Sequence, residues 1–285
     1  MGGLSTGLAP EWLALRENAD AAARATDLLA RLSSTRVPGS NTRVPGSSTR
    51  VPGSGAEPLI RDLGCGTGAM GRWLSGRLPG RQRWVLHDRD PGLLRVALES
   101  FGVSGRVVSV TAVPGDLAGL RTADLAGTSL VTASALLDLL TAAEVEALAA
   151  ACLGAGCPAL LTLTVLGRVV FDPPDPLDVD LAAAFNAHQR RDDRLGPSAF
   201  EVAAEAFARG AVVYREPSPW RLGPTDTALT AEWLHGWVSA AVEQLPTLAG
   251  PARSYLDRRL EAIAAGALRV TVSHADLLAL PEVAR

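Results

Sequence analysis

The sequence contains no lysine, so its 27 basic residues are all arginine. They are outnumbered by 30 acidic residues, which gives a formal net charge of −3. No stretch forms a basic stripe, and aromatic residues make up only 5% of the chain. Proteins that bind nucleic acid usually need such a stripe or aromatic stacking platforms. We therefore expect no nucleic-acid partner.

Cysteine is scarce. The three cysteines, Cys65, Cys152 and Cys157, form no CxxC pair and have no HExxH or His-x-His companion. Their number is odd, so a disulfide framework is not indicated, and no metal site is predicted. Free cysteines of this kind are typical of a reducing compartment.

Long apolar runs are also missing. No run approaches the ~20 residues that a membrane-spanning helix needs. The stretch MGGLSTGLAPEWLALREN at the N-terminus has no apolar core of the length found in signal peptides. We therefore expect no membrane partner and a cytoplasmic location.

What the chain does contain is a regular alternation of strand-like and helix-like segments. With 285 residues, 47% of them hydrophobic, it can bury one large core or a core with a cap. Continuous apolar strands separated by helices are typical of a parallel sheet covered on both faces. The sequence therefore predicts an α/β fold with a doubly wound, mostly parallel sheet. Expected strands lie at 83–87, 106–112, 129–133, 159–166, 211–215 and 268–273, and the clearest expected helices at 91–101 and 141–153.

We divide the chain into three parts. Residues 1–33 form an N-terminal helical segment, with one helix expected over 10–32, and residues 34–55 form a linker. Residues 56–285 form the main domain. Two helical cap insertions are expected in it, at about 167–196 and 224–266. Insertions at such places commonly cover the carboxyl ends of the strands, where ligands bind.

The linker contains one phrase written three times, STRVPGS, NTRVPGS and STRVPGS. Val-Pro-Gly-Ser is a turn sequence, because proline presets φ and glycine tolerates positive φ. Lengthening a surface loop costs little, about 0.6 kcal/mol for each doubling. We expect a tolerated loop insertion. A partner-binding arm that presents Arg36, Arg43 and Arg50 is the alternative.

The stretch Asp62-Leu-Gly-Cys-Gly-Thr-Gly68 follows directly on a short apolar run. Glycine lets the backbone turn tightly and approach a ligand, and a helix N-terminus favours anionic groups. Asp88 stands twenty residues beyond Gly68, at the end of the next strand, where an acid can accept both hydroxyls of a ribose. Asp116, in Gly-Asp-Leu after the strand that follows, could accept an adenine amino group.

Together these motifs resemble those of the class I S-adenosylmethionine-dependent methyltransferases. DLGCGTG is similar to the glycine motif of that family, HDRDPGLL to its second motif and PGDL to its third. The resemblance covers about residues 58–166. It implies a seven-stranded, mostly parallel sheet with an antiparallel terminal strand, and S-adenosyl-L-methionine as cofactor. The cofactor-binding residues that it implies are Asp62, Gly64, Cys65, Gly66, Gly68, Asp88, Arg89, Asp116, Leu117 and Ser134.

Two alternatives remain open. Gly66, Gly68 and Gly71 also satisfy the GxGxxG pattern of NAD(P)-dependent oxidoreductases. That pattern would begin several residues past the strand, and a Tyr-x-x-x-Lys pair is impossible without lysine. The other alternative is a non-catalytic module that binds S-adenosylmethionine. A polar cluster for the acceptor would separate an enzyme from such a module.

The methyl acceptor is expected to be a small molecule, because no [DN]PP[YFW] motif follows the strand at 129–133. Methyl transfer from a sulfonium depends mainly on alignment, and a general base is needed only when a proton must leave early. As catalytic candidates the sequence offers His188 and Asp138, and as substrate-binding candidates Arg191 and Trp220. It leaves the oligomeric state open.

Overall fold

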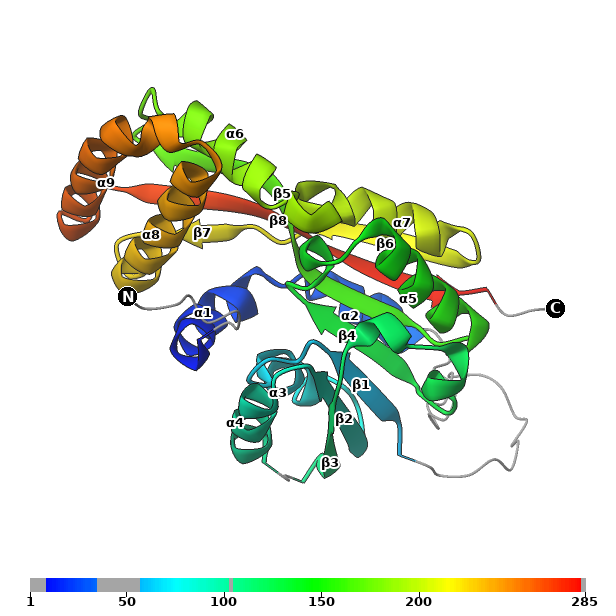
Figure 1. Cartoon of the computed structure of the whole chain (residues 1–285). Coiled ribbons are helices and arrows are strands. Elements are labelled where there is room, and N and C mark those ends of the chain that lie inside the picture. The colour runs from blue at the N-terminus through cyan, green and yellow to red at the C-terminus, as the bar shows by residue number, and fades with distance from the viewer. Residues whose placement is uncertain (1–8, 35–56, 103–104, 283–285) are drawn as a thin grey trace, which may run out of the picture.

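The computed structural model describes residues 9–34, 57–102 and 105–282. In this part of the chain, eight strands form one sheet with the order β3-β2-β1-β4-β5-β8-β6, and β7 also pairs with β8 (Figure 1). Strands β1 to β5 run parallel, whereas β8 runs antiparallel to both β5 and β6. The strands are β1 (Leu59–Leu63), β2 (Gln82–Asp88), β3 (Val107–Pro114), β4 (Leu130–Ser134), β5 (Ala159–Asp172), β6 (Ala211–Pro217), β7 (Trp220–Leu222) and β8 (Arg269–Pro281).

This arrangement confirms the expected mostly parallel sheet with an antiparallel strand near the C-terminus of the chain. The antiparallel strand β8 lies between β5 and β6, and β6 at the edge has the direction of the parallel strands. The eighth strand, β7, was not expected. It has only three residues and follows Pro219 closely, so its sequence carries no strand pattern of its own.

Helices cover both faces of the sheet. On one face, α2 (Asp27–Ser34), α3 (Ala69–Ser75) and α4 (Pro91–Phe101) share a buried apolar cluster with β1 and β2. On the other face, α5 (Ala142–Gly154) and α7 (Ala199–Ala208) pack on β4, β5 and β8. The two layers give the chain the doubly wound architecture that the alternating segments predict.

Local signals explain where several of these helices begin. Asp90 caps α4, because its side chain accepts hydrogen bonds from the N–H groups of Gly92 and Leu93, and Pro91 occupies the first turn. Thr141 and Glu144 form a capping box at the start of α5. Both helices lie within one residue of their expected bounds.

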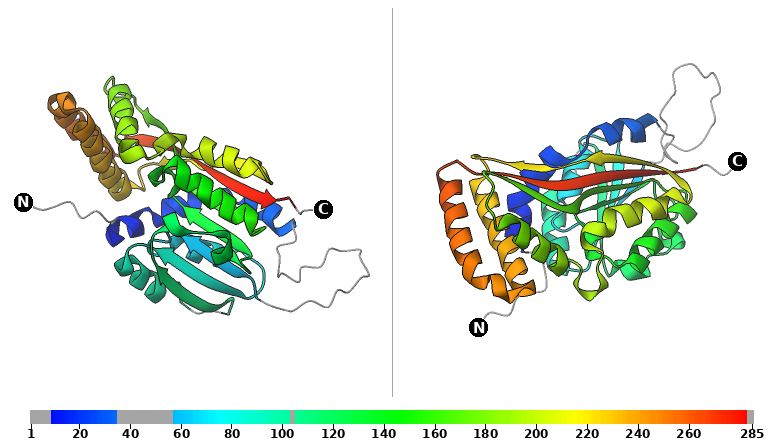
Figure 2. Two further views of the ribbon diagram at one scale, coloured as in Figure 1. Left: turned by 45° about the vertical axis from the view of Figure 1, so that its right-hand side comes forward. Right: turned by 90° about the horizontal axis from the view of Figure 1, so that it is seen from above.

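The cap stands on an extension of the sheet. The second half of β5 pairs with the first half of β8, and β7 adds a third strand. Helices α6 (Asp178–His188), α8 (Thr227–Gln244) and α9 (Ala249–Ala264) pack on this extension around Phe171, Trp237 and Tyr255 (Figure 2).

Strand β5 is longer than the strand expected over 159–166. It continues to Asp172, into the segment where the first insertion was expected to begin at about residue 167. Within β5, Gly167 has a φ of 69° and lies at a shift of register between Val165 and Val169, beyond which the strand continues.

The single helix expected over 10–32 is two helices, α1 (Pro10–Ala23) and α2, separated at Arg24–Thr26. The buried carboxylate of Asp276 holds this break, because it accepts a hydrogen bond from the N–H of Ala25 at 2.8 Å. The same carboxylate accepts from the N–H of Leu163 at 2.7 Å and the hydroxyl of Ser218 at 2.5 Å. Asp276 thus fixes irregular points in three distant segments.

The triple repeat, apart from Ser34, lies outside the described residues. Among the helices that the structure describes, none combines the length and apolar character needed to cross a membrane.

Candidate functional site

A cavity of about 740 Å³ opens at the carboxyl ends of β1, β2 and β4. The glycine turn after β1 and the loop after β3 form part of its wall, and one face of α1 covers it. Nine of the ten predicted cofactor residues line this cavity. They are Asp62, Gly64, Cys65, Gly66, Asp88, Arg89, Asp116, Leu117 and Ser134. The tenth, Gly68, is the N-cap residue of α3.

The glycine turn has a backbone that other residues rarely adopt. Gly64 has a φ of 60°, and a Cβ built on it would lie 2.8 Å from a methyl carbon of Leu136. Gly68 has a φ of 84°, and a Cβ there would lie 3.3 Å from Nη1 of Arg72. The turn therefore requires glycine at both positions. Gly71 serves another purpose, because a Cβ on it would lie 2.0 Å from the ring of Phe101 on α4.

Two acids face the turn from β1 and β2. Asp62 is buried, and its Oδ1 accepts a hydrogen bond from the hydroxyl of Thr132 at 2.8 Å. Its Oδ2 has no hydrogen-bond partner among the described residues. Burial raises the pKa of Asp62 to about 7, although Thr132 and the charge of Arg24 oppose the rise. A group with this environment is a candidate for binding a cation.

Asp88 has a different environment. Its Oδ2 accepts from the N–H of Gly66 at 2.8 Å and its Oδ1 from the N–H of Asp90 at 2.9 Å. These two bonds fix the orientation of the carboxylate and leave lone pairs for a ligand, since each oxygen can accept more than one bond. Asp116 and Arg89 lie exposed at the rim, next to half-buried Leu117.

Helix α1 turns a polar face toward the cavity. Leu13, Arg16, Asp20 and Arg24 all line it, and their spacing of three, four and four residues places them on one side of the helix and its end. Asp20 and Arg24 were not among the residues predicted from the sequence. The recurrence of charged residues at every fourth position was the available signal.

Arg24 is the most unusual of these residues. It is only 4% exposed, and its Nη2 donates to the hydroxyl of Ser134 at 3.1 Å. Its Nε and Nη1 have no hydrogen-bond partner in the described part of the chain. Burial lowers the pKa of Arg24, against the opposing charges of Asp20, Asp276 and Asp62. Arg24 lines the cavity, and a guanidinium with unpaired donors is suited to bind an anion.

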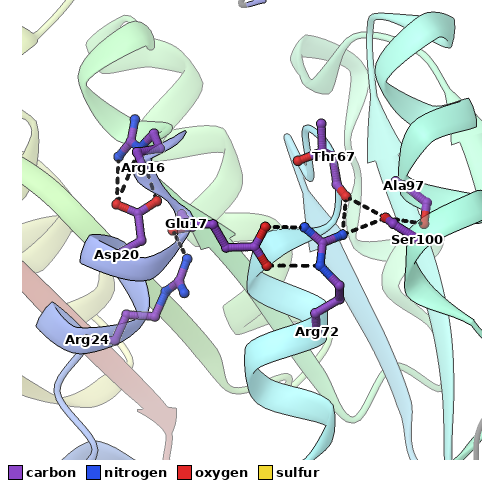
Figure 3. A network of polar contacts seen from close by, with 9 residues as sticks. Arg16, Glu17, Asp20, Arg24, Thr67, Arg72, Ala97 and Ser100 are labelled. Atoms are coloured by element: carbon purple, nitrogen blue, oxygen red, sulfur yellow. Dashed lines mark hydrogen bonds and ion pairs between the residues drawn. The ribbon is translucent and has the colours of Figure 1, made fainter. Parts of the chain in front are cut away.

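Ion pairs hold α1 in place (Figure 3). Arg16 and Asp20 form a pair at 3.0 Å within the helix, and Glu17 pairs with Arg72 of α3 at 2.6 Å. Arg72 also donates to the backbone carbonyl of Thr67 in the glycine turn. Helix α1, which covers the cavity, is thus linked through Arg72 to the glycine turn in the cavity wall.

The structure does not bring the predicted acceptor residues together. His188 lies at the end of α6, where its Nε2 is 3.4 Å from Glu243 of α8. Arg191 contacts the same carboxylate and donates to Gln244 at 2.7 Å. Neither residue lines the cavity, since both side chains are paired with Glu243 near the end of α8. Arg194, three residues further on, lines the cavity.

The other two acceptor candidates lie close to the cavity without lining it. Trp220 is buried in β7, where its indole N–H donates to Asp20. Asp138 is 9% exposed in a short 3-10 turn after β4, and its Oδ1 has no partner among the described residues. Burial raises the pKa of Asp138. Their assignment to the acceptor stays a prediction.

No model of a known protein family matches the sequence, and no curated protein matches it. Solved structures do match. The cyclopropane synthase MmaA2 from Mycobacterium tuberculosis is 16% identical, with 79% of each chain covered and a TM-score of 0.45. The YcgJ protein from Bacillus subtilis is 13% identical, with 80% of this chain and 94% of that chain covered and a TM-score of 0.47.

A third match is phosphoethanolamine N-methyltransferase 2 from Haemonchus contortus in complex with S-adenosyl-L-methionine. It is 16% identical, with 79% of this chain but only 49% of that chain covered, and the TM-score is 0.40. At such identities and scores the comparisons say nothing about substrate or activity. The topology itself, a mostly parallel sheet with the antiparallel strand β8 and helical insertions, agrees with the one that the sequence resemblance implies.

Proposed function

We propose that the protein is an S-adenosylmethionine-dependent methyltransferase that acts on a small molecule by direct displacement of the methyl group. One observation carries the proposal. One cavity at the carboxyl ends of the strands is lined by the glycine turn and by Asp62, Asp88 and Asp116, the acids of the three motifs.

Each end of the cofactor has a matching group in the cavity. Asp88 would accept the ribose hydroxyls, and Asp116 the adenine amino group. Asp62, with its free Oδ2, would face the ammonium group of the methionine part, and Arg24, with its two free donors, the carboxylate. The atoms of these two buried side chains that have no partner among the described residues would thus be paired with groups of opposite charge.

When bound, the cofactor would supply a methyl group on a sulfonium. A lone pair of the acceptor would form the new bond to the methyl carbon as the carbon–sulfur bond breaks, and the sulfur would leave as a neutral thioether. The protein then has to align the two reactants and exclude water, and alignment alone can contribute ~7–11 kcal/mol. Helix α1 covers the cavity and would limit access of water to the reacting atoms. The apolar side chains of Leu13 and Leu136 line the same space.

The experiment is thermal unfolding of the full chain with S-adenosylhomocysteine, NAD and NADP in parallel, repeated on Asp88→Ala. A ligand at 100 times its dissociation constant adds about 2.7 kcal/mol to the free energy of unfolding. We expect stabilisation by S-adenosylhomocysteine alone, and a weaker effect in the variant. Asp257→Ala, an exposed acid on α9, is the matched control.

Stabilisation by a nicotinamide instead would identify an oxidoreductase and refute the proposal. Stabilisation by S-adenosylhomocysteine without methyl transfer to any acceptor would favour a non-catalytic binding module. The two cases differ in the ligand that binds, so one set of unfolding curves separates them.

A further inference from the structure

The cavity extends beyond the residues assigned to the cofactor. Past Ser134, its lining includes Leu136, Leu139 and Leu140 from the segment after β4, and Leu13 of α1 lines the same cavity. Leu139 is 43% exposed, which is high for a leucine in a site of this kind. We call these four leucines the apolar corner. If the cofactor occupies the acidic part, the acceptor has to enter here.

Arg194 lies at this corner and is weakly paired. Within the described residues, its one carboxylate neighbour in ion-pair range is Asp192, at 3.9 Å, and the Asp192 side chain is 82% exposed. Such a contact contributes little in water. The Arg194 side chain is itself 45% exposed. Its guanidinium therefore has donors to offer to a ligand in the cavity.

The other charges of the corner are already engaged. Arg16 is paired with Asp20. Glu144 uses Oε2 to accept from both the N–H and the hydroxyl of Thr141, each at 2.8 Å. The Asp138 carboxyl is buried nearby, and the charges of Arg16 and Arg194 both act on it.

The backbone presents Arg194 in a defined way. Asp192 and Asp193 have φ values of 57° and 58°, in the left-handed region that residues other than glycine rarely adopt. Arg194 then forms a β-bridge with Thr141, and the N–H of Leu195 donates to the carbonyl of Leu140 at 2.9 Å. Strained backbone of this kind persists where the surrounding structure fixes it, often at functional sites.

We propose that Arg194 binds the oxyanion of the methyl acceptor, a small acid whose apolar part packs against the apolar corner. An arginine at the rim of an apolar pocket can bind a carboxylate or phosphate through two parallel hydrogen bonds. The inference rests on the proposed function, since it takes the acidic part of the cavity for the cofactor.

The test uses four probes with the same eight-carbon chain: octanoate, octyl phosphate, octanol and octylamine. Calorimetric titration and thermal unfolding are run on the full chain, with and without S-adenosylhomocysteine. We expect octanoate or octyl phosphate to bind, whichever oxyanion the site prefers, and octanol and octylamine to bind at least about tenfold more weakly, because a charged hydrogen bond is lost.

Arg194→Gln should weaken binding of the acid by at least about tenfold and leave the effect of S-adenosylhomocysteine unchanged. Arg190→Gln is the matched control, because Arg190 is exposed and, within the described part of the chain, its side chain donates only to the carbonyl of Asn186. Leu139→Ser, at an exposed position, should weaken all bound probes alike.

Binding of octylamine or octanol as tight as that of the acids would overturn the inference, and so would acid binding that Arg194→Gln leaves intact. Failure of every probe to bind would also contradict it. If S-adenosylhomocysteine still stabilises the protein in these cases, the proposed function stands while the inference falls. Loss of that stabilisation would remove the proposed function itself.

Discussion

Trp220 donates its indole N–H to the buried carboxylate of Asp20 at 3.0 Å, across 200 residues of sequence. The guanidinium of Arg16 lies over the same indole, 4.9 Å from its centre, and pairs with Asp20. A strand of the cap therefore fixes two residues of α1 that line the cavity. Trp220 acts on the site through these residues without lining it.

Trp220→Phe should keep the aromatic surface under Arg16 and remove the donor to Asp20. A hydrogen bond to a buried charged group contributes about 1.5–3 kcal/mol, so we expect the free energy of unfolding to fall by about that amount. Urea denaturation measures it. Trp233→Phe on α8 is the control, since the Trp233 ring stacks on Trp237 and a phenyl ring keeps much of that contact. Equal losses in the two variants would argue against a special role of the Trp220 donor.

Arg24→Met should abolish most of the affinity for S-adenosylhomocysteine while the free protein stays as stable as before. Burial destabilises the charged guanidinium more than its acidic neighbours stabilise it, as the lowered pKa indicates. We expect the dissociation constant to rise at least about tenfold. Titration calorimetry checks the affinity, and thermal unfolding the stability. Arg95→Met, at an exposed position of α4, should change neither.

The affinity for S-adenosylhomocysteine should depend on pH through Asp62. Below the Asp62 pKa of about 7, the carboxyl is protonated and cannot attract the ammonium group of the ligand; above it, the carboxylate can. Affinity should therefore rise with pH by at most about tenfold per unit and level off above pH 7. Titrations between about pH 5.5 and 8, the range around that pKa, measure it. A flat profile in the native protein would contradict the assignment, whereas Asp62→Asn should be flat.

In the protein without ligand, the raised pKa of Asp62 makes the free energy of unfolding depend on pH. The folded state binds the proton of Asp62 more tightly than the unfolded state, whose carboxyl has a pKa of about 3.9. The contribution of Asp62 to the free energy of unfolding is thus full at low pH and is lost as pH rises toward 7.

Deletion of two of the three VPGS repeats between residues 34 and 55 should leave the melting temperature and ligand binding unchanged. Shortening such a loop changes the closure entropy by about 1 kcal/mol or less. A scrambled linker of the original length is the control. A large drop in melting temperature would show that the repeat stabilises the fold, and a loss of activity alone would favour the arm presented by Arg36, Arg43 and Arg50.

Much of the core could be predicted because its signals are local. The helix expected over 91–101 is α4 with the same bounds, since Asp90, Pro91 and the apolar spacing mark it without help from other segments. The acids at the ends of β1 and β2 follow from motifs of a few residues. In a parallel sheet such strand ends meet at one edge, so the cavity follows from the motifs as well.

The break between α1 and α2 could not be predicted in this way. It depends on Asp276, which is more than 240 residues away and accepts the hydrogen bond of Ala25. The inward position of Arg24 depends on the same break. From the sequence, an arginine in an alanine-rich helix is expected to be exposed to solvent. Of the acids near Arg24, Asp62 and Asp276 come from other segments and approach it only in the tertiary structure.

Which residues of the segment after β5 line the cavity could not be predicted, for a related reason. FNAHQRRDDR contains one histidine and three arginines, and nothing in the sequence tells which side chain reaches the cavity. Glu243, on a helix more than 50 residues later, contacts His188 and Arg191 and leaves Arg194 to the cavity. The left-handed backbone at Asp192 and Asp193 could not be predicted either, because neither position is a glycine.

Strand β8 runs through both the cap and the core. Its first residues pair with β7 in the cap, and its last residues pair with β6 in the core, without a hinge between the two. The cap is therefore not a module that evolution or an engineer can exchange at a linker. Cutting it away would remove half of β5 and of β8 and leave the core sheet with frayed ends. If the protein is a methyltransferase as proposed, a new acceptor would have to be accommodated by changing side chains and loops, residue by residue.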